Sequence, residues 1–349
     1  MQIKSTLRNI KKFYECKKNI NMALLISEIE PVISGSRIHN LGHYDNEIIQ
    51  KAVKDFVIGR LKISEEDFRH FFNPVTRIDA NEFANNPYFK YVKLDKIVDG
   101  NISIERIPYE AYELAILDEP SQNMDLLRKY SFGIFDNEAF TYVLFEDDKV
   151  WMSINPMEMR TAAKAIENGY GDVLVLGGGL GYYPLMVSLK ENVSSVHIVE
   201  SNPVIFKLLN EKIIPQFPNN KVTIELSDAY KYLDSMRKAY DTIYIDVWED
   251  NVTGMNDYLK FVKYEEKYPS AHFDYWLENS LLDSIIANIA QYFSAKLGTE
   301  EYQKYFSFVA PGLWRYMEDI EDTIDRPEQA EYYMSRRFVK DLCKKIEKL

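Results

Sequence analysis

Residues 173–182 read Val173-Leu-Val-Leu-Gly177-Gly-Gly179-Leu-Gly181-Tyr182. The aliphatic half of this stretch predicts a buried strand, and the residues that follow it predict a helix. A strand that runs into a glycine-rich turn and then a helix is typical of ligand sites at the carboxyl edge of a parallel sheet, because glycine lets the backbone come close to a ligand. We therefore expect an α/β fold with a ligand bound beside this turn.

Strands and helices alternate on both sides of the turn. We predict strands over residues 172–176, 195–199, 222–226 and 242–245, and helices over residues 157–168, 184–190, 203–214 and 229–236. Alternation at this spacing favours βαβ units, which build a mostly parallel sheet with helices on both faces. The predicted fold class is therefore a Rossmann-like α/β fold.

The flanking sequence has different patterns. Residues before 72 show apolar positions at helical spacing, and short runs rich in β-branched and aromatic residues predict strands over 89–94, 102–107, 112–117, 130–135, 139–145 and 149–154. Beyond residue 250 we predict helices over 276–297, 300–306 and 329–349. The chain of 349 residues exceeds the usual size of one domain. We divide it into a helical N-terminal region (1–87), a small antiparallel β domain (88–154), the ligand-binding α/β domain (155–260) and a helical C-terminal region (261–349).

The glycine spacing argues against a dinucleotide. The dinucleotide pattern is Gly-x-Gly-x-x-Gly, in which the third glycine lets the helix pack closely on the strand and seat a pyrophosphate. Counted from Gly177, the third position holds Tyr182, and counted from Gly179 it holds Pro184. NAD and FAD are therefore disfavoured.

The pattern Gly177-x-Gly179-x-Gly181 instead resembles motif I of the class I S-adenosylmethionine-dependent methyltransferases. The resemblance covers residues 155–250 and implies a Rossmann-like methyltransferase fold. It also implies that these three glycines let the backbone approach the methionine and ribose parts of S-adenosylmethionine, the expected cofactor.

Acidic residues follow the next predicted strands in the order that this resemblance implies. Glu200 directly follows the strand over 195–199, where a carboxylate can accept hydrogen bonds from both ribose hydroxyls. Asp228 and Ala229 follow the strand over 222–226, and the resemblance places them beside the adenine amino group. We therefore expect Glu200, Asp228 and Ala229 to bind the cofactor.

The segment Asp246-Val-Trp248-Glu249-Asp250 ends the fourth predicted strand and resembles motif IV of the same family. Asp246 is the candidate to orient an acceptor amine or to accept its proton, and Glu249 is the second candidate catalytic carboxylate. Trp248 and Asp250 are the candidate substrate-binding residues. The expected substrate is a small molecule, with an amine as the acceptor group.

Within this family the sequence looks most like the spermidine synthase group, on the triple-glycine loop, the preceding β-rich unit and the acidic motif IV. Leu180 stands where that group has Asp, and Asp250 stands where it has Pro. We therefore expect a methyltransferase first and an aminopropyltransferase that uses decarboxylated S-adenosylmethionine second. A third alternative is a non-catalytic binding or scaffold protein that has kept the fold, with the helical flanks as its partner surface.

Composition and charge limit the kinds of partner, metal site and compartment that are expected. The net charge of −12 would repel a phosphate backbone, so no nucleic acid is expected. Cys16 and Cys343 are too few for a disulfide scaffold or a four-thiolate metal site, which favours a reducing cytoplasm. The five histidines form no compact metal motif, so no metal is predicted, and no apolar run reaches membrane-spanning length. The helical flanks are expected to form a lid over the pocket or a homodimer interface.

Overall fold

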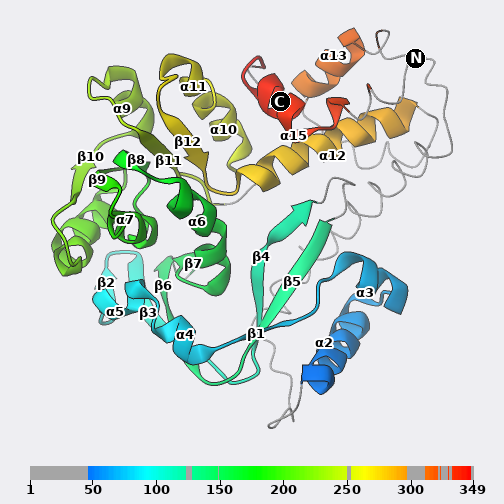
Figure 1. The fold of residues 1–349 in the computed structure, drawn as a ribbon, viewed down its shortest axis with the longest axis horizontal. Helices are drawn as coiled ribbons and strands as arrows, with labels where there is room; N and C mark the ends of the chain where they lie inside the picture. Colours follow the sequence, from blue (N-terminus) through cyan, green and yellow to red (C-terminus); the bar gives the residue numbers. More distant parts are fainter. Residues whose placement is uncertain are drawn as a thin grey trace.

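A computed structural model describes residues 46–122, 128–147, 149–249, 253–296, 311–320 and 332–346, together with residues 323 and 329. The parallel sheet and its helices form one body, and the β-rich segments lie beside it (Figure 1). Helices α2 and α3 lie at the far end of the β-rich part, and the C-terminal helices lie next to the parallel sheet. None of the helices in the described ranges combines the length with the apolar character that a membrane span needs.

The central sheet has five parallel strands in the order β10-β9-β8-β11-β12. Their bounds are β8 (Gly171–Leu176), β9 (Val193–Glu200), β10 (Val222–Leu226), β11 (Thr242–Ile245) and β12 (His272–Tyr275). The chain builds outward from β8 to β10 and then returns to place β11 on the other side of β8. This reversal is the switch point of a doubly wound sheet, where such folds bind ligands at the carboxyl ends of the strands. The strand order confirms the predicted Rossmann-like fold.

One helix, α6 (Pro156–Asn168), precedes the first of these strands, and the other helices connect them. The connecting helices are α7 (Tyr182–Ser188), α8 (Pro203–Leu208), α9 (Ala229–Ser235), α10 (Met255–Phe261) and α11 (Tyr264–Lys267), and α8 continues through a π-helical turn (Leu209–Ile213) and a 3-10 turn (Ile214–Gln216). Side-chain caps fix three of the starts: Asn155, Asn202 and Asp228 each accept a hydrogen bond from a backbone N–H in the first helical turn. Strand β8 is fully buried over residues 173–176, as the aliphatic run predicts.

Strand β12 was not predicted from the sequence. The expectation of helices alone beyond residue 250 is wrong at His272–Tyr275, which pairs with β11 in the register Thr242↔His272 to Ile245↔Tyr275. The strand is only 4 residues long and its burial alternates, so it carries too little periodicity to be recognised alone. Its place is set by pairing with β11 rather than by its own sequence.

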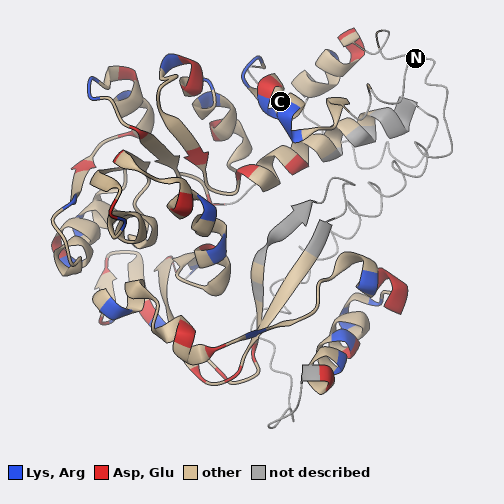
Figure 2. Cartoon of the chain, in the orientation of Figure 1, with Lys and Arg blue, Asp and Glu red and all other residues tan. Residues whose placement is uncertain are grey.

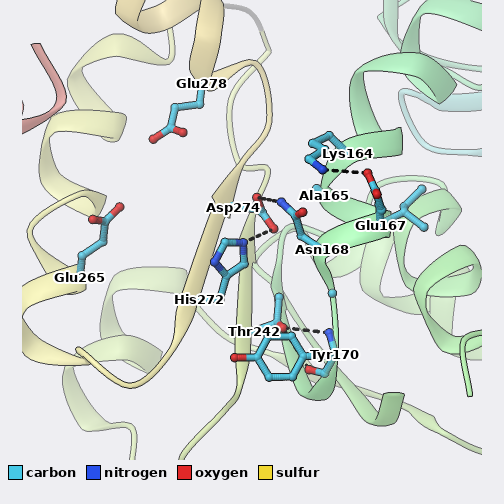
Figure 3. A network of polar contacts seen from close by, with 12 residues as sticks. Lys164, Ala165, Glu167, Asn168, Tyr170, Thr242, Glu265, His272, Asp274 and Glu278 are labelled. Atoms are coloured by element: carbon cyan, nitrogen blue, oxygen red, sulfur yellow. Dashed lines mark hydrogen bonds and ion pairs between the residues drawn. The ribbon is translucent and has the colours of Figure 1, made fainter. Parts of the chain in front are cut away.

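Contacts at the amino edge of the sheet join β12 to the end of α6 (Figure 3). Asn168 donates a hydrogen bond from Nδ2 to Oδ1 of Asp274 at 3.0 Å, and Nε2 of His272 lies 3.0 Å from Oδ2 of the same carboxylate. Burial raises the pKa of Asp274, and both partners oppose that shift. In the same region the hydroxyl of Thr242 accepts the N–H of Tyr170 and donates a hydrogen bond to its carbonyl. These contacts lie at the opposite edge from the glycine-rich turn and stabilise the sheet.

The β-rich part consists of two sheets. One is antiparallel, in the order β2-β3-β6-β7, with β2 (Ile97–Asp99), β3 (Ile102–Tyr109), β6 (Ala139–Glu146) and β7 (Lys149–Ser153). The other has the order β1-β5-β4, with β1 (Thr76–Ile78), β4 (Leu114–Gln122) and β5 (Arg128–Phe135), and β1 runs parallel to β5. The strands predicted over 102–154 are therefore confirmed. The limits of the four predicted domains stay a prediction.

The strand predicted over 89–94 is wrong, because that segment begins as helix α5 (Pro87–Tyr91). Asn86 caps the helix by accepting the N–H of Tyr88, and Pro87 occupies the first helical position, where its fixed φ suits a helix. Of the aromatic residues that suggested a strand, Phe89 is buried in the core and Tyr91 is partly buried against it. The local capping sequence outweighs the β-propensity of the aromatic run.

The N-terminal helices form a second hydrophobic core. Helices α2 (Asn46–Leu61) and α3 (Glu65–Phe71) pack their apolar residues against β4 and β5, apart from the main core. A further short helix, α4 (Ala80–Ala84), precedes α5. The predicted helical character is confirmed for these elements, and residues 1–45 lie outside the described part.

After β12 the described part of the C-terminal region contains the helices α12 (Glu278–Lys296), α13 (Pro311–Ile320) and α15 (Arg336–Cys343). The helix predicted over 276–297 is confirmed, that over 300–306 lies outside the described residues, and α15 covers part of that over 329–349. A bidentate ion pair joins α12 to α15: Arg336 donates from Nε to Oδ1 of Asp283 at 2.9 Å and from Nη2 to Oδ2 at 3.0 Å. Asp283 is fully buried.

We expect the Arg336→Leu variant to lower the free energy of unfolding by about 3–5 kcal/mol, because it removes the cation from a buried carboxylate. Chemical denaturation measures the effect. Arg69→Leu on α3 is the control, because Arg69 is exposed, and it should change the free energy by less than about 0.5 kcal/mol. Equal effects of the two substitutions would show that the Asp283 ion pair contributes nothing specific.

Candidate functional site

A cavity of about 520 Å³ opens at the carboxyl edge of the parallel sheet. The glycine-rich turn after β8, the ends of β9 and β11, the first turn of α6 and strand β7 supply its walls. The cavity therefore lies where the strand order reverses. Its volume falls within the range of small-molecule and cofactor sites.

The backbone of the glycine-rich turn explains its sequence. Gly177, Gly179 and Gly181 have φ angles of +90°, +49° and +79°. Residues that carry a side chain rarely adopt this left-handed backbone region. A Cβ atom on Gly177 would also collide with the backbone carbonyl of Asp246. A Cβ atom on Gly179 would lie 3.1 Å from Sδ of Met152, which lines the cavity. Gly177 thus permits β8 and β11 to end close together, and Gly179 keeps the cavity wall free of a side chain.

We expect the Gly177→Ala variant to lower the free energy of unfolding by about 2–5 kcal/mol, since it adds a backbone clash to an unfavourable φ. The matched control is Gly59→Ala in α2, where an added Cβ would meet nothing within 4 Å. Because alanine is the better helix former, this control should raise stability by about 0.5–1 kcal/mol. Denaturant unfolding of both variants gives the comparison. A neutral Gly177→Ala would contradict the tight approach of the two strands.

Glu200 is held by the backbone on both carboxylate oxygens. Its Oε2 accepts the N–H of Gly178 at 2.9 Å, and its Oε1 accepts the N–H of Asn202 at 2.8 Å. The side chain is 8% exposed and lines the cavity. Each oxygen keeps a further lone pair, so the carboxylate can still accept hydroxyl hydrogens from a ribose. The geometry suits the predicted role, and Gly178, which the sequence analysis did not assign, completes the link between turn and carboxylate.

Asp246 lies at the end of β11 beside the glycine-rich turn and lines the cavity. Burial raises the pKa of Asp246 to about 7, with the hydroxyl of Tyr244 opposing the shift and the charge of Glu200 adding to it. The Tyr244 hydroxyl lies 3.4 Å from Oδ2. A carboxyl group that titrates near neutrality is suited to accept a proton from a substrate.

The neighbouring residues Asp228 and Ala229 have different environments in the structure. Asp228 is exposed and accepts the N–H of Lys231 at 2.9 Å, which makes it the cap of α9. Ala229 lines the cavity, together with Ser227. The role of Asp228 beside an adenine stays a prediction, and its observed contact is the helix cap.

The residues after β11 reach the cavity in different ways. Trp248 is buried, lines the cavity and donates a hydrogen bond from Nε1 to the carbonyl of Trp276 at 3.2 Å. Glu249 is exposed and lines the cavity as well. Asp250 lies outside the described residues. The cavity thus includes Asp246, Trp248 and Glu249 of the predicted catalytic segment.

Three further lining residues were missed by the sequence analysis: Glu158, Asp257 and Trp276. Glu158 and Asp257 lie in the first turns of α6 and α10, where an acidic residue is ordinarily read as helix stabilisation. Asp257 accepts hydrogen bonds from the Tyr230 hydroxyl at 2.7 Å and from Lys260 at 3.0 Å. Trp276 follows β12, the strand that was not recognised. No sequence signal places these side chains at the cavity, because tertiary packing brings them there.

The described lining of the cavity carries charge of one sign. Its ionisable acids are Glu158, Glu200, Asp246, Glu249 and Asp257, and the described lining includes no Lys, Arg or His. Elsewhere both signs mix: Figure 2 shows basic residues interspersed with acidic ones on helices α2, α3 and α15. Among the described residues, no cluster of three or more His, Cys, Asp or Glu side chains could hold a metal ion. The acidic lining favours a positively charged ligand over an anionic one.

Comparisons with known proteins give the following similarities. No protein-family model and no curated protein match the sequence. Among solved structures, the chain is similar to spermidine synthase from Thermotoga maritima (13% identity, TM-score 0.32, covering 42% of this chain and 55% of that one). It is also similar to a spermidine synthase in complex with the transition-state analogue AdoDATO (15%, 0.30, 38% and 48%) and to Trm5b from Pyrococcus abyssi (15%, 0.28, 38% and 37%). The chain spans about half the length of the spermidine synthases it matches, and its fold assignment rests on the strand order.

Proposed function

We propose that the protein is an S-adenosylmethionine-dependent transferase, and most simply a methyltransferase, that acts on a small cationic amine. The observation that carries the proposal is the cavity at the switch point of the sheet, with Glu200 held toward it and no basic side chain in its described lining. A sulfonium and a protonated amine are both cations, so this charge suits donor and acceptor together. Aromatic lining residues such as Trp248 and Tyr244 add faces that attract cations.

Different residues of the cavity have different roles in this reaction. Gly177, Gly179 and Gly181 leave room for the donor, and Glu200 accepts hydrogen bonds from its ribose. When bound, the sulfonium supplies an electrophilic carbon, so the protein mainly aligns the nucleophile. Asp246 accepts the proton that the acceptor ammonium must lose before its nitrogen can attack. Glu249, at the exposed side of the cavity, attracts the cationic acceptor.

The pH dependence follows from Asp246. Its pKa of about 7 means that the carboxylate, which is the form able to accept a proton, predominates only above that pH. We expect kcat/KM to rise about tenfold per pH unit below about pH 7 and to level off above it. Initial rates measured from about pH 5.5 to about pH 9 test this. A profile that is flat through neutrality, or that falls as pH rises, would exclude Asp246 as the base.

A second candidate is aminopropyl transfer from decarboxylated S-adenosylmethionine. One observation favours it: the described lining offers no Lys or Arg to pair with the carboxylate of an intact methionine group. The decarboxylated donor carries an ammonium and a sulfonium, and it would place no anion among the cavity acids. Both candidates use the same glycine-rich turn, Glu200 and Asp246, and they differ in the group transferred.

Product analysis separates the candidates. The protein is incubated with each donor and a panel of small diamines and polyamines, and the products are identified by mass spectrometry. Methylated amines formed from S-adenosylmethionine support the first candidate, and aminopropylated amines formed from the decarboxylated donor support the second. Binding of either donor without any product would favour the third alternative, a non-catalytic protein that has kept the fold.

A further inference from the structure

Tyr88 on α5 contacts the glycine-rich turn but does not belong to the described lining of the cavity. Its hydroxyl donates a hydrogen bond to the backbone carbonyl of Leu180 at 2.7 Å, across 92 positions of sequence. Tyr88 is fully buried and Leu180 is 3% exposed, so no water can replace this partner. The hydrogen bond therefore satisfies a carbonyl within the turn that would otherwise be buried alone.

The tyrosine is itself fixed by its neighbours. Its ring packs edge-on against Phe89 and Tyr142 and lies 5.8 Å from the ring of Tyr182, the first residue of α7. Burial raises the pKa of Tyr88 well above its ordinary value, so the hydroxyl stays a donor at any physiological pH. A second contact from the same helix start joins Nδ2 of Asn86 to the Tyr182 hydroxyl at 3.5 Å. Contacts from α5 and its capping residue thus reach both Leu180 in the turn and Tyr182 at the start of α7.

We infer that Tyr88 is a positioning residue that holds the glycine-rich turn in its donor-binding conformation through the Leu180 carbonyl. Leu180 has no polar side chain to secure the turn from within, and three glycines give the turn wide conformational freedom. The hydrogen bond from α5 limits that freedom, in addition to the backbone hydrogen bond from the N–H of Gly181 to the carbonyl of Gly178 at 2.9 Å. The amide of Gly178 then stays directed at Glu200, and the cavity wall keeps its shape.

The inference rests on the proposed function, because the turn is useful to a donor only if the protein binds one. Without the Tyr88 hydroxyl the turn should occupy other conformations for much of the time. The apparent affinity then falls by the fraction of molecules that remain competent to bind. The donor KM should rise while kcat at saturating donor changes little, since Tyr88 touches neither substrate nor the reacting atoms.

The test compares Tyr88→Phe with Tyr142→Phe. Tyr142 belongs to the same aromatic cluster and is 4% exposed, and its hydroxyl accepts the N–H of Leu94 at 3.2 Å instead of contacting the turn. We measure the Kd for S-adenosylmethionine and its decarboxylated form by calorimetry, and amide hydrogen exchange over residues 177–181 without ligand. Tyr88→Phe should raise the Kd roughly tenfold and speed exchange in the turn roughly tenfold, whereas Tyr142→Phe should leave both within about twofold.

Equal effects of the two substitutions would overturn the inference, because they would show general loosening of the cluster. If the wild-type protein binds neither donor, the proposed function fails, while hydrogen exchange in the unliganded variants still decides whether Tyr88 holds the turn. A measurement on the wild type needs no variant: α5 and residues 177–181 should open together, with exchange free energies that fall in parallel as denaturant is added. Independent opening of the two segments would contradict the inference.

Discussion

The Asp246→Asn variant should lose about 10²–10⁴-fold in kcat while it retains most of its affinity for the donor. Asparagine keeps the size of the side chain but cannot accept a proton from an ammonium. It also removes the carboxyl group whose pKa of about 7 sets the expected pH dependence, so the rise of the remaining activity through neutrality should disappear. Steady-state kinetics across pH, with donor binding measured in parallel, gives both results.

The control for this substitution lies at the other end of β11. Asp241 precedes β11, and its Oδ2 accepts the N–H of Asp172 at 2.8 Å near the opposite edge of the sheet. Asparagine at position 241 keeps an acceptor oxygen, so Asp241→Asn should leave kcat and its pH profile within about twofold. An Asp246→Asn protein with full activity at every pH would show that the proton is accepted elsewhere.

The Glu200→Gln variant should raise the Kd for the adenosyl donor about a hundredfold or more. Both oxygens of Glu200 accept backbone N–H groups, from Gly178 and Asn202. A glutamine must turn its NH₂ group toward one of these donors, which leaves a buried N–H without a partner and disturbs the turn. The loss of charge also weakens hydrogen bonds to the ribose, which are strongest to an ionised acceptor. The two effects together account for the expected size of the increase in Kd.

The control is Glu225→Gln on the neighbouring strand β10, where the side chain is 51% exposed and lies outside the described lining of the cavity. It should leave the Kd within about twofold. Unfolding measured for both variants separates a local loss of binding from a global loss of stability. A Glu200→Gln protein that is stable and binds the donor as the wild type does would remove the carboxylate from the site.

The sequence was most informative where local chemistry decides structure. The run from Val173 to Gly181 predicted a strand, a turn and the site beside it, because positive φ angles and close backbone approach require glycine. Glu200 and Asp246 follow directly because each ends a parallel strand at the same edge of the sheet. In these cases the position of the residue along the chain is enough to predict its position in the site.

Tertiary packing determined what could not be predicted. Strand β12 is recognisable only through its pairing with β11, and with it Trp276 enters the cavity. Glu158 and Asp257 lie in the first turns of their helices, and only the packing of α6 and α10 directs them to the site. Asp228 also follows a strand, and its observed contact is the cap of α9, so its predicted place beside an adenine stays a prediction. One acidic residue after a strand is therefore ambiguous between these two roles.

Calorimetric titration of S-adenosylmethionine and its decarboxylated form into the wild-type protein and the Glu200→Gln variant tests the central claim most directly. The account predicts that the wild type binds at least one of the two donors at one site per chain, and that the variant binds it about a hundredfold more weakly or not at all. No heat of binding from either donor with the folded wild-type protein would contradict the assignment of this cavity to an adenosyl donor.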